Sequence, residues 1–154
     1  MLIATAIALG WIERMIPLEN VLPGVKLGLA NVVVLVALDR FGTKEAVLVM
    51  LLRVILSGFL FSTPSALIYS LSGGVLSLLI MIPALHWQKL SLIGVSVLGA
   101  TFHNIGQWLA VVAVTQTAGI SLYLPVLMLS GLACGFVTGL IAAAVLRCLT
   151  EQIR

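Results

Sequence analysis

The sequence predicts an all-α, polytopic membrane protein whose six transmembrane helices form a single domain over residues 1–154. Hydrophobic residues make up 62% of the chain and charged residues only 8%, whereas a soluble domain carries about 25% charged residues. The chain also divides into six apolar stretches, most of them close to the length of about 17 to 25 residues that a helix needs to cross a bilayer. Prolines, glycines and polar residues separate these stretches and mark the helix ends.

The first three predicted helices are bounded by turn and capping residues. The first covers about Leu2–Ile16 and ends before a proline, which disfavours helical backbone in the residue that precedes it. The second covers about Val25–Phe41, and Gly42 is well placed to end it. The third covers about Lys44–Phe61, and the hydroxyl of Thr43 can cap its first turn.

The last three predicted helices are longer. The fourth covers about Pro64–Ile82, with Thr63 as its cap and a proline in its first turn, and Pro83 is expected to close it. The fifth covers about Leu90–Thr117, which is long enough to tilt or to protrude from the membrane. The sixth covers about Leu122–Leu149.

Lysine and arginine are distributed unevenly between the two ends of these helices. An even number of spans puts both termini on one side, and that side has five flanking cations: Arg40, Lys44, Lys89, Arg147 and Arg154. The opposite side has two, Arg14 and Lys26. Because cytoplasmic loops carry the excess of positive charge, we expect a multi-pass protein of the bacterial cell membrane with both termini in the cytoplasm.

A polar motif, TFHNIGQWLA at residues 101–110, interrupts the fifth predicted helix. His103 and Gln107 are four residues apart and therefore share one face of the helix, while Asn104 lies about 100° around it. Burying such groups without partners costs roughly 2–7 kcal/mol each in an apolar medium. The motif is therefore expected to meet either polar partners or a ligand.

Further polar side chains fall at the middle or the outer half of other predicted helices. Arg53 lies near the middle of the third helix, where a charge costs about 2.5–3.5 kcal/mol on insertion scales. The others are Asn31 and Lys26 on the second helix, Arg14 on the first and Tyr69 on the fourth. Together with His103, Asn104 and Gln107, these residues predict a substrate-binding pocket that opens to the outside, with Arg53 as its positive end.

Each of these residues also has a structural interpretation. Arg53 can instead pair with Glu13 and hold two helices together. His103 can be a satisfied interior histidine, and Asn31 can bond a neighbouring backbone group. The two outer cations can simply mark the membrane interface, and Tyr69 can be a packing or interfacial aromatic residue.

Several kinds of chemistry are not expected. The chain has no GxxxxGK[ST] motif for a nucleotide, and its single aspartate, Asp39, cannot form a carboxylate cluster for magnesium. Its two histidines fall on different helices, and its two cysteines are about 21 Å apart on one predicted helix, too far for a disulfide. We therefore expect no catalytic residue, no metal site, no cofactor and no nucleic-acid partner.

Small residues recur at helical spacing in two of the predicted helices. Gly131, Gly135 and Gly139 form a GxxxGxxxG stripe on the sixth helix, and Ala4 and Ala8 form a smaller pair on the first. Such stripes let another helix backbone approach closely. Each of them serves either packing inside the bundle or docking of a partner.

Four segments carry a resemblance to a known family: PGVKLGLANVVVLVAL, LLRVILSG, YSLSGGVLSLLIM and SLIGVSVLGATFHNIGQ. From about Ala8 to Leu146 the chain resembles the Gx transporter family, also labelled heptaprenyl diphosphate synthase component I. That family is in turn similar to the substrate-binding S components of energy-coupling factor (ECF) transporters. These six-helix membrane proteins bind a vitamin or metabolite from outside and work with a coupling protein and two ATPases.

The resemblance implies an S-component-like bundle in which Ala4 and Ala8 match the AxxxA docking motif of S components. It implies a transport subunit, embedded in membrane lipid, that binds a small or amphiphilic solute such as an isoprenoid precursor, with ECF coupling and ATPase subunits as partners. Two alternatives stay open. One is a non-catalytic accessory component of polyprenyl (heptaprenyl) diphosphate or quinone synthesis, and the other is a subunit of a flavin-linked membrane redox assembly.

Overall fold

The structure is a computed structural model that describes residues 1–16, 27–61, 63–87 and 89–151. These ranges contain six α-helices, a short 3-10 helix and no strand, which confirms the predicted all-α fold. The helices are α1 (Leu2–Met15), α3 (Leu29–Arg40), α4 (Thr43–Phe61), α5 (Pro64–His86), α6 (Leu92–Thr115) and α7 (Leu124–Glu151). The 3-10 helix η1 (Ala118–Tyr123) leads directly into α7.

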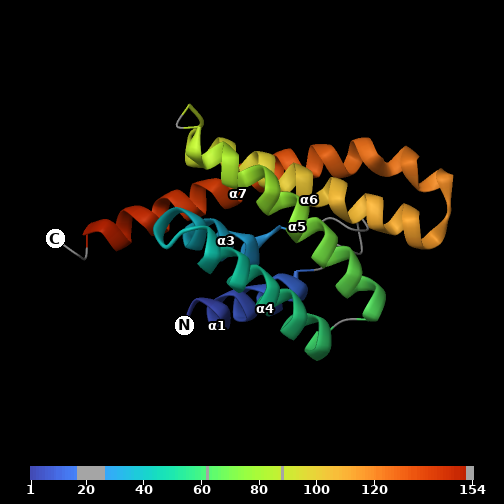
Figure 1. Ribbon diagram of the computed structural model, residues 1–154, viewed down its shortest axis with the longest axis horizontal. Helices are drawn as coiled ribbons and strands as arrows, with labels where there is room; N and C mark the ends of the chain where they lie inside the picture. The colour runs from blue at the N-terminus through green and yellow to red at the C-terminus, as the bar shows by residue number, and fades with distance from the viewer. Residues whose placement is uncertain (17–26, 62, 88, 152–154) are drawn as a thin grey trace.

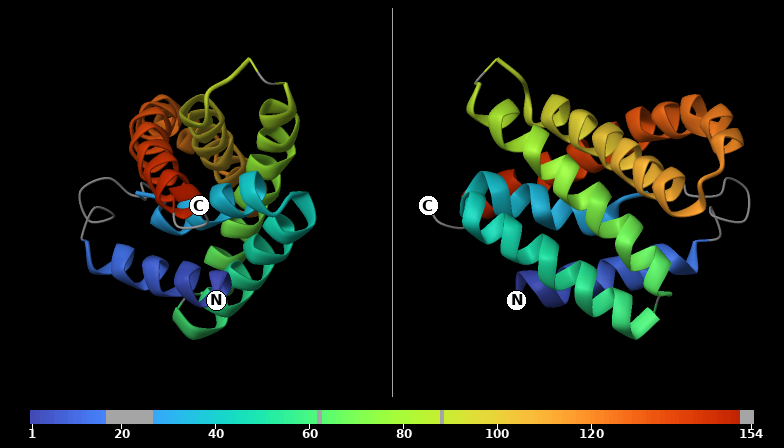
Figure 2. Two further views of the ribbon diagram at one scale, coloured as in Figure 1. Left: turned by 90° about the vertical axis from the view of Figure 1, so that its left-hand side faces the viewer. Right: turned by 45° about the vertical axis from the view of Figure 1, so that its right-hand side comes forward.

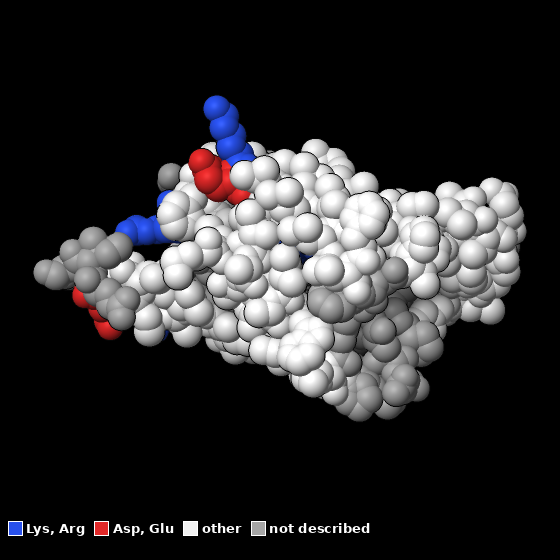
Figure 3. Space-filling view, turned by 90° about the horizontal axis from the view of Figure 1, so that it is seen from below, with Lys and Arg blue, Asp and Glu red and all other residues white. Residues whose placement is uncertain are grey.

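The helices run mainly along the long axis of the molecule and reverse direction at its two ends (Figure 1). Both termini lie at the same end, together with the turn between α3 and α4 and the turn between α5 and α6 (Figures 1 and 2). Charged side chains gather at this end in the space-filling view, whereas the described surface of the opposite end has none on that face (Figure 3). The exposed charged side chains of this end are Asp39, Arg40, Lys44, Glu45, Lys89, Arg147 and Glu151.

Three helical segments are long and apolar enough to cross a membrane: α5, α6 and residues 119–151, which include α7. Helix α1 is apolar but shorter. Helix α4 has 19 residues, but Lys44, Glu45 and Arg53 interrupt its apolar character. Large apolar side chains such as Phe59, Leu129 and Phe136 are exposed on the outside of the bundle, as expected for a protein whose outer surface faces lipid.

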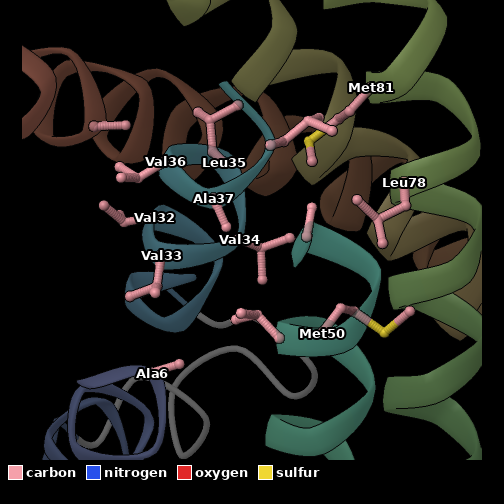
Figure 4. Close-up of a cluster of buried hydrophobic side chains, with 14 of the residues drawn as sticks. Ala6, Val32, Val33, Val34, Leu35, Val36, Ala37, Met50, Leu78 and Met81 are labelled. Atoms are coloured by element: carbon pink, nitrogen blue, oxygen red, sulfur yellow. The ribbon is translucent and has the colours of Figure 1, made fainter. Parts of the chain in front are cut away.

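Helix α3 is the centre of the bundle. It packs against α1, α4 and α7, and every residue from Val32 to Leu38 is buried. Figure 4 shows the α3 side chains between Ala6 of α1 and the group formed by Met50, Leu78 and Met81 of α4 and α5. A helix that is apolar on all sides can be stable only when other helices surround it.

Glycines hold α5, α6 and α7 close together. A Cβ atom on Gly106 would lie 2.7 Å from the carbonyl oxygen of Ser72, and one on Gly135 would lie 2.7 Å from the Cα atom of Val97. Gly131 and Gly139 of the same stripe are also buried against backbone atoms of α6. The GxxxGxxxG stripe therefore serves packing inside the bundle.

Several helix ends differ from the predicted ones. Pro83 lies inside α5, which continues to His86. A proline this close to the end of a helix removes one backbone hydrogen bond, but the remaining residues can still complete the last turn. Helix α3 begins at Leu29 because Gly28 has a φ of +78°, outside the right-handed helical region. The Thr63 cap is confirmed by a 3.3 Å hydrogen bond from the backbone N–H of Ala66 to its hydroxyl oxygen.

The close contact between α5 and α6 gives a first prediction. Gly106→Ala would place a methyl group against the Ser72 carbonyl oxygen, so the two helices must separate. We expect the substitution to lower the free energy of unfolding by about 1–3 kcal/mol, the usual cost of overpacking. Denaturation of the purified protein in detergent measures this change.

Gly10→Ala is the matched control, because its new Cβ would meet only the Cβ of Ala30 at 3.7 Å, an ordinary contact. Alanine has the higher helix propensity, so this control should be neutral or slightly stabilising. Equal stability of the two variants would contradict the packing argument.

Candidate functional site

Arg53 and Asn31 form the centre of the candidate site. The Arg53 Nη2 atom, in the middle of α4, donates a 2.6 Å hydrogen bond to the side-chain oxygen of Asn31 in the first turn of α3. The Nε atom of Arg53 is buried and has no hydrogen-bond partner among the described residues. Because a guanidinium carries five N–H donors and no acceptor, Arg53 has more donors than Asn31 can satisfy.

Glu13 supplies a negative charge close to this pair. Its carboxylate accepts a hydrogen bond from the backbone N–H of Gly28, which ties the end of α1 to the start of α3. The carboxylate also acts electrostatically on the Arg53 guanidinium, although no ion pair is recorded between these two described residues. Arg53 and Glu13 are therefore not paired directly. Arg53 bonds Asn31, Glu13 bonds Gly28, and both of these partners lie at the start of α3.

The polar motif of α6 divides between two helix interfaces. The Asn104 side-chain nitrogen donates to the Leu127 carbonyl at 2.6 Å and to the Ser130 hydroxyl at 3.3 Å, both on α7. His103 and Gln107 face α5 instead, because a Cβ atom on Gly73 would lie 3.0 Å from the His103 Cε1 atom and 2.8 Å from the Gln107 Cγ atom.

The amide nitrogen of Asn104 is thus engaged in joining α6 to α7. Ligand binding by His103, Asn104 and Gln107 stays a prediction.

The other predicted site residues have different positions. Tyr69 is half-buried on α5, one helical turn before Gly73 and on the same face. Lys26 and the side chain of Arg14 lie outside the described part of the structure. Ala4 and Ala8 are exposed on α1, whereas Ala6 between them is buried in the core. The predicted docking pair is therefore accessible to lipid or to a partner.

A small cavity with a mostly apolar lining lies beside Asn31, and the sequence did not predict it. Its volume is about 20 Å³, and its polar lining consists of Asn31, Ser77, Ser96 and Thr138 from four different helices. The hydroxyls of Ser96 and Thr138 are 2.9 Å apart and bond α6 to α7.

One pattern in the sequence could have predicted the three hydroxyls of Ser77, Ser96 and Thr138. Each is three residues from a glycine, in the pairs 74 and 77, 96 and 99, and 135 and 138, so each lies on the closely packed face of its helix. No group of three or more His, Cys, Asp or Glu side chains in the described ranges is arranged to hold a metal ion.

Comparison with known proteins gives one match. The sequence model of the family described as heptaprenyl diphosphate synthase component I matches residues 2–145, nearly the whole chain. This match confirms the heptaprenyl diphosphate synthase component I family that the motifs around Asn31, Arg53 and His103 indicated, while the likeness to ECF S components stays a prediction. No curated protein and no solved structure matches the chain.

The indirect link between Arg53 and Glu13 gives a second prediction. Arg53→Gln removes the positive charge that acts on the Glu13 carboxylate and the hydrogen bond to Asn31, so we expect a loss of about 1–3 kcal/mol in the free energy of unfolding. Adding Glu13→Gln should restore part of this loss, because the two charges depend on each other. Chemical denaturation of the single and double variants measures the coupling.

Arg40→Gln is the control for removing a cation, since Arg40 is exposed at the end that carries both termini. Its effect should stay within about 0.5 kcal/mol. Strictly additive effects of Arg53→Gln and Glu13→Gln would show that the two charges are not coupled.

Proposed function

The chain belongs to the heptaprenyl diphosphate synthase component I family, and we propose that it serves there as a solute-binding membrane subunit without catalytic activity. The observation that carries this proposal is the guanidinium of Arg53 in the middle of α4, held by Asn31 at 2.6 Å and with its buried Nε atom unpartnered in the described residues. An ionisable residue inside a membrane bundle usually marks a substrate or ion pathway.

The solute that best suits Arg53 has an anionic head group. The guanidinium has donors beyond the one that Asn31 uses, and its flat fork matches carboxylate and phosphate oxygens. The surrounding helices are strongly apolar, which favours a ligand whose remaining part is small or hydrophobic. An isoprenoid precursor or another amphiphilic anion has this combination.

The absence of catalytic activity is part of the proposal. Prenyl diphosphate synthases hold magnesium with clusters of aspartates, whereas the only aspartate of this chain is Asp39. Asp39 is exposed at the last turn of α3, at the opposite end of that helix from Asn31. The family description would then refer to association with a synthesis pathway.

Partner proteins form the second part of the proposal. The description of the family as a component I suggests that its members work with at least one further component. The exposed Ala4 and Ala8 on α1 offer a flat helix face, and S components of ECF transporters use such a motif to bind their coupling protein. We therefore propose an S-component-like role with a coupling protein and ATPase subunits.

A second candidate function is supported by the family match itself. The chain would be a non-catalytic accessory that holds a soluble heptaprenyl diphosphate synthase at the membrane. In this role Arg53 would serve the stability of the bundle, and the partner would be the catalytic subunit. A flavin-linked redox assembly is the third arrangement, distinguished by flavoprotein partners.

One purification experiment separates these functions. The tagged protein is extracted in mild detergent, and the proteins and small molecules that it retains are identified by mass spectrometry. ATPase and coupling subunits support the S-component role, a soluble prenyl synthase supports the accessory role, and flavoproteins support the redox role.

Two sets of variants act as controls for each other. The Arg53→Gln, Glu13→Gln double variant should retain at least tenfold less anionic ligand, about 1.4 kcal/mol, while keeping its partners. Replacing both Ala4 and Ala8 by leucine should remove the partners and keep the ligand, and Gln107→Leu tests whether the α6 motif contributes. Undiminished ligand in the double variant would rule out Arg53 as the binding group.

The orientation is also a proposal, supported by the exposed cations Arg40, Lys44, Lys89 and Arg147 at the end that holds both termini, where acidic side chains also lie (Figure 3). In a background without Cys134 and Cys148, Glu19→Cys should react with an impermeant thiol reagent in intact cells, and Thr43→Cys should not. The reverse labelling pattern would invert the proposed topology.

A further inference from the structure

Asn31 has a hydrogen-bonding group that its bond to Arg53 leaves unused. Because arginine can only donate, the side-chain oxygen of Asn31 must face Arg53, and the amide nitrogen is left as a donor. No acceptor for this nitrogen is recorded among the described residues. The Ser77 hydroxyl, buried on α5, likewise has no recorded hydrogen bond within the described chain.

Both of these groups belong to residues that line the same cavity. The centre of a water-sized sphere can move through about 20 Å³ of this cavity, and a single water molecule needs roughly 10–15 Å³ of such space. Water stays in such a space when it finds two to four polar partners, whereas cavities lined only by apolar side chains remain dry even when they are larger. Among the lining residues, Asn31 and Ser77 supply two partners, and Ser96 and Thr138 supply two further hydroxyl oxygens.

We infer that this cavity is a binding site for one water molecule, which links α3 to the three closely packed helices α5, α6 and α7. The water accepts a hydrogen bond from the Asn31 amide nitrogen and donates to the Ser77 hydroxyl oxygen. Its second hydrogen is directed to the Ser96–Thr138 pair. The Thr138 hydroxyl already donates to the Cys134 carbonyl at 2.9 Å, so its oxygen is available only as an acceptor.

A monovalent cation is the competing occupant, because neutral oxygens also suit sodium. The position of Arg53 argues against a cation. The Asn31 oxygen already accepts from the guanidinium at 2.6 Å, so a second positive charge in the cavity would be repelled at short range inside an apolar bundle. A water molecule satisfies the same groups without this cost.

The water site has a consequence for Arg53 and does not depend on the proposed function. With the water in place, both ends of the Asn31 amide are fixed, the oxygen by Arg53 and the nitrogen by the water. The side chain then has one orientation, and the guanidinium is held in one position.

Nuclear magnetic resonance of the full-length, nitrogen-labelled protein in detergent micelles tests the inference directly. The side-chain amide signal of Asn31, assigned in the wild-type protein through its backbone resonances, should show a cross-peak to water with the sign of a long-lived bound molecule. A resolved Asn31 signal without this cross-peak overturns the inference, even if every variant below fails to fold.

Ser77→Val provides the second readout, because it replaces the hydroxyl with methyl groups that fill the cavity. We expect the cross-peak to disappear and Tm to fall by about 2–4 °C, since the Asn31 nitrogen loses its partner. Ser72→Val on the same helix is the matched control, because the Ser72 hydroxyl bonds the Ile68 carbonyl at 3.0 Å and does not line the cavity.

Two results contradict a bound water. One is a Ser77→Val protein that melts no lower than Ser72→Val, which is the result expected if the cavity holds no water. The other is a wild-type Tm that rises when sodium replaces choline at constant ionic strength, which would identify a cation site.

Discussion

A permanently charged guanidinium inside an apolar bundle must be hydrogen-bonded, and much of this architecture meets that requirement for Arg53. Asn31 can reach Arg53 only if the first turn of α3 lies beside the middle of α4. The left-handed backbone of Gly28 starts α3 at the right place and presents its N–H to Glu13. Helices α1, α3 and α4 are therefore positioned by one polar cluster as well as by the packing of the α3 side chains.

The other half of the bundle combines glycines with polar side chains in a different way. Asn104 reaches the Leu127 carbonyl because Gly131 leaves room for it, and a Cβ atom at Gly131 would lie 3.1 Å from the Asn104 nitrogen. Gly73 gives the same freedom to His103 and Gln107 on the neighbouring face of α6, which packs against α5. The polar motif and the glycines are thus parts of one packing arrangement, since a Cβ atom at Gly73 or Gly131 would collide with the polar side chains.

The sequence predicts the helices well and the contacts of the polar residues less well. Apolar length and the Thr63 cap locate α4 and α5, but Gly28 and Pro83 act through backbone geometry that hydropathy does not register. Helical periodicity correctly separates Asn104 from His103 and Gln107, yet it cannot say which neighbour each face meets.

The pairing of Asn31 with Arg53 was within reach of the sequence. The two residues lie eleven positions on either side of Gly42, and residues equidistant from the turn of an antiparallel helix pair lie at the same level. The role of Glu13 was not accessible in this way, because its link to Gly28 depends on how α1 packs against α3.

The position of Glu13 also bears on how solute binding and partner binding would influence each other. An anionic group that binds Arg53 competes with the electrostatic attraction between Glu13 and the guanidinium. Glu13 belongs to α1, whose end it fastens to Gly28, and α1 also carries the exposed Ala4 and Ala8. If Ala4 and Ala8 bind a partner, any shift of α1 that accompanies solute binding alters the docking face, and by thermodynamic linkage the partner alters solute affinity by the same factor. The charge that stabilises Arg53 in the unliganded bundle would then also couple the two sites.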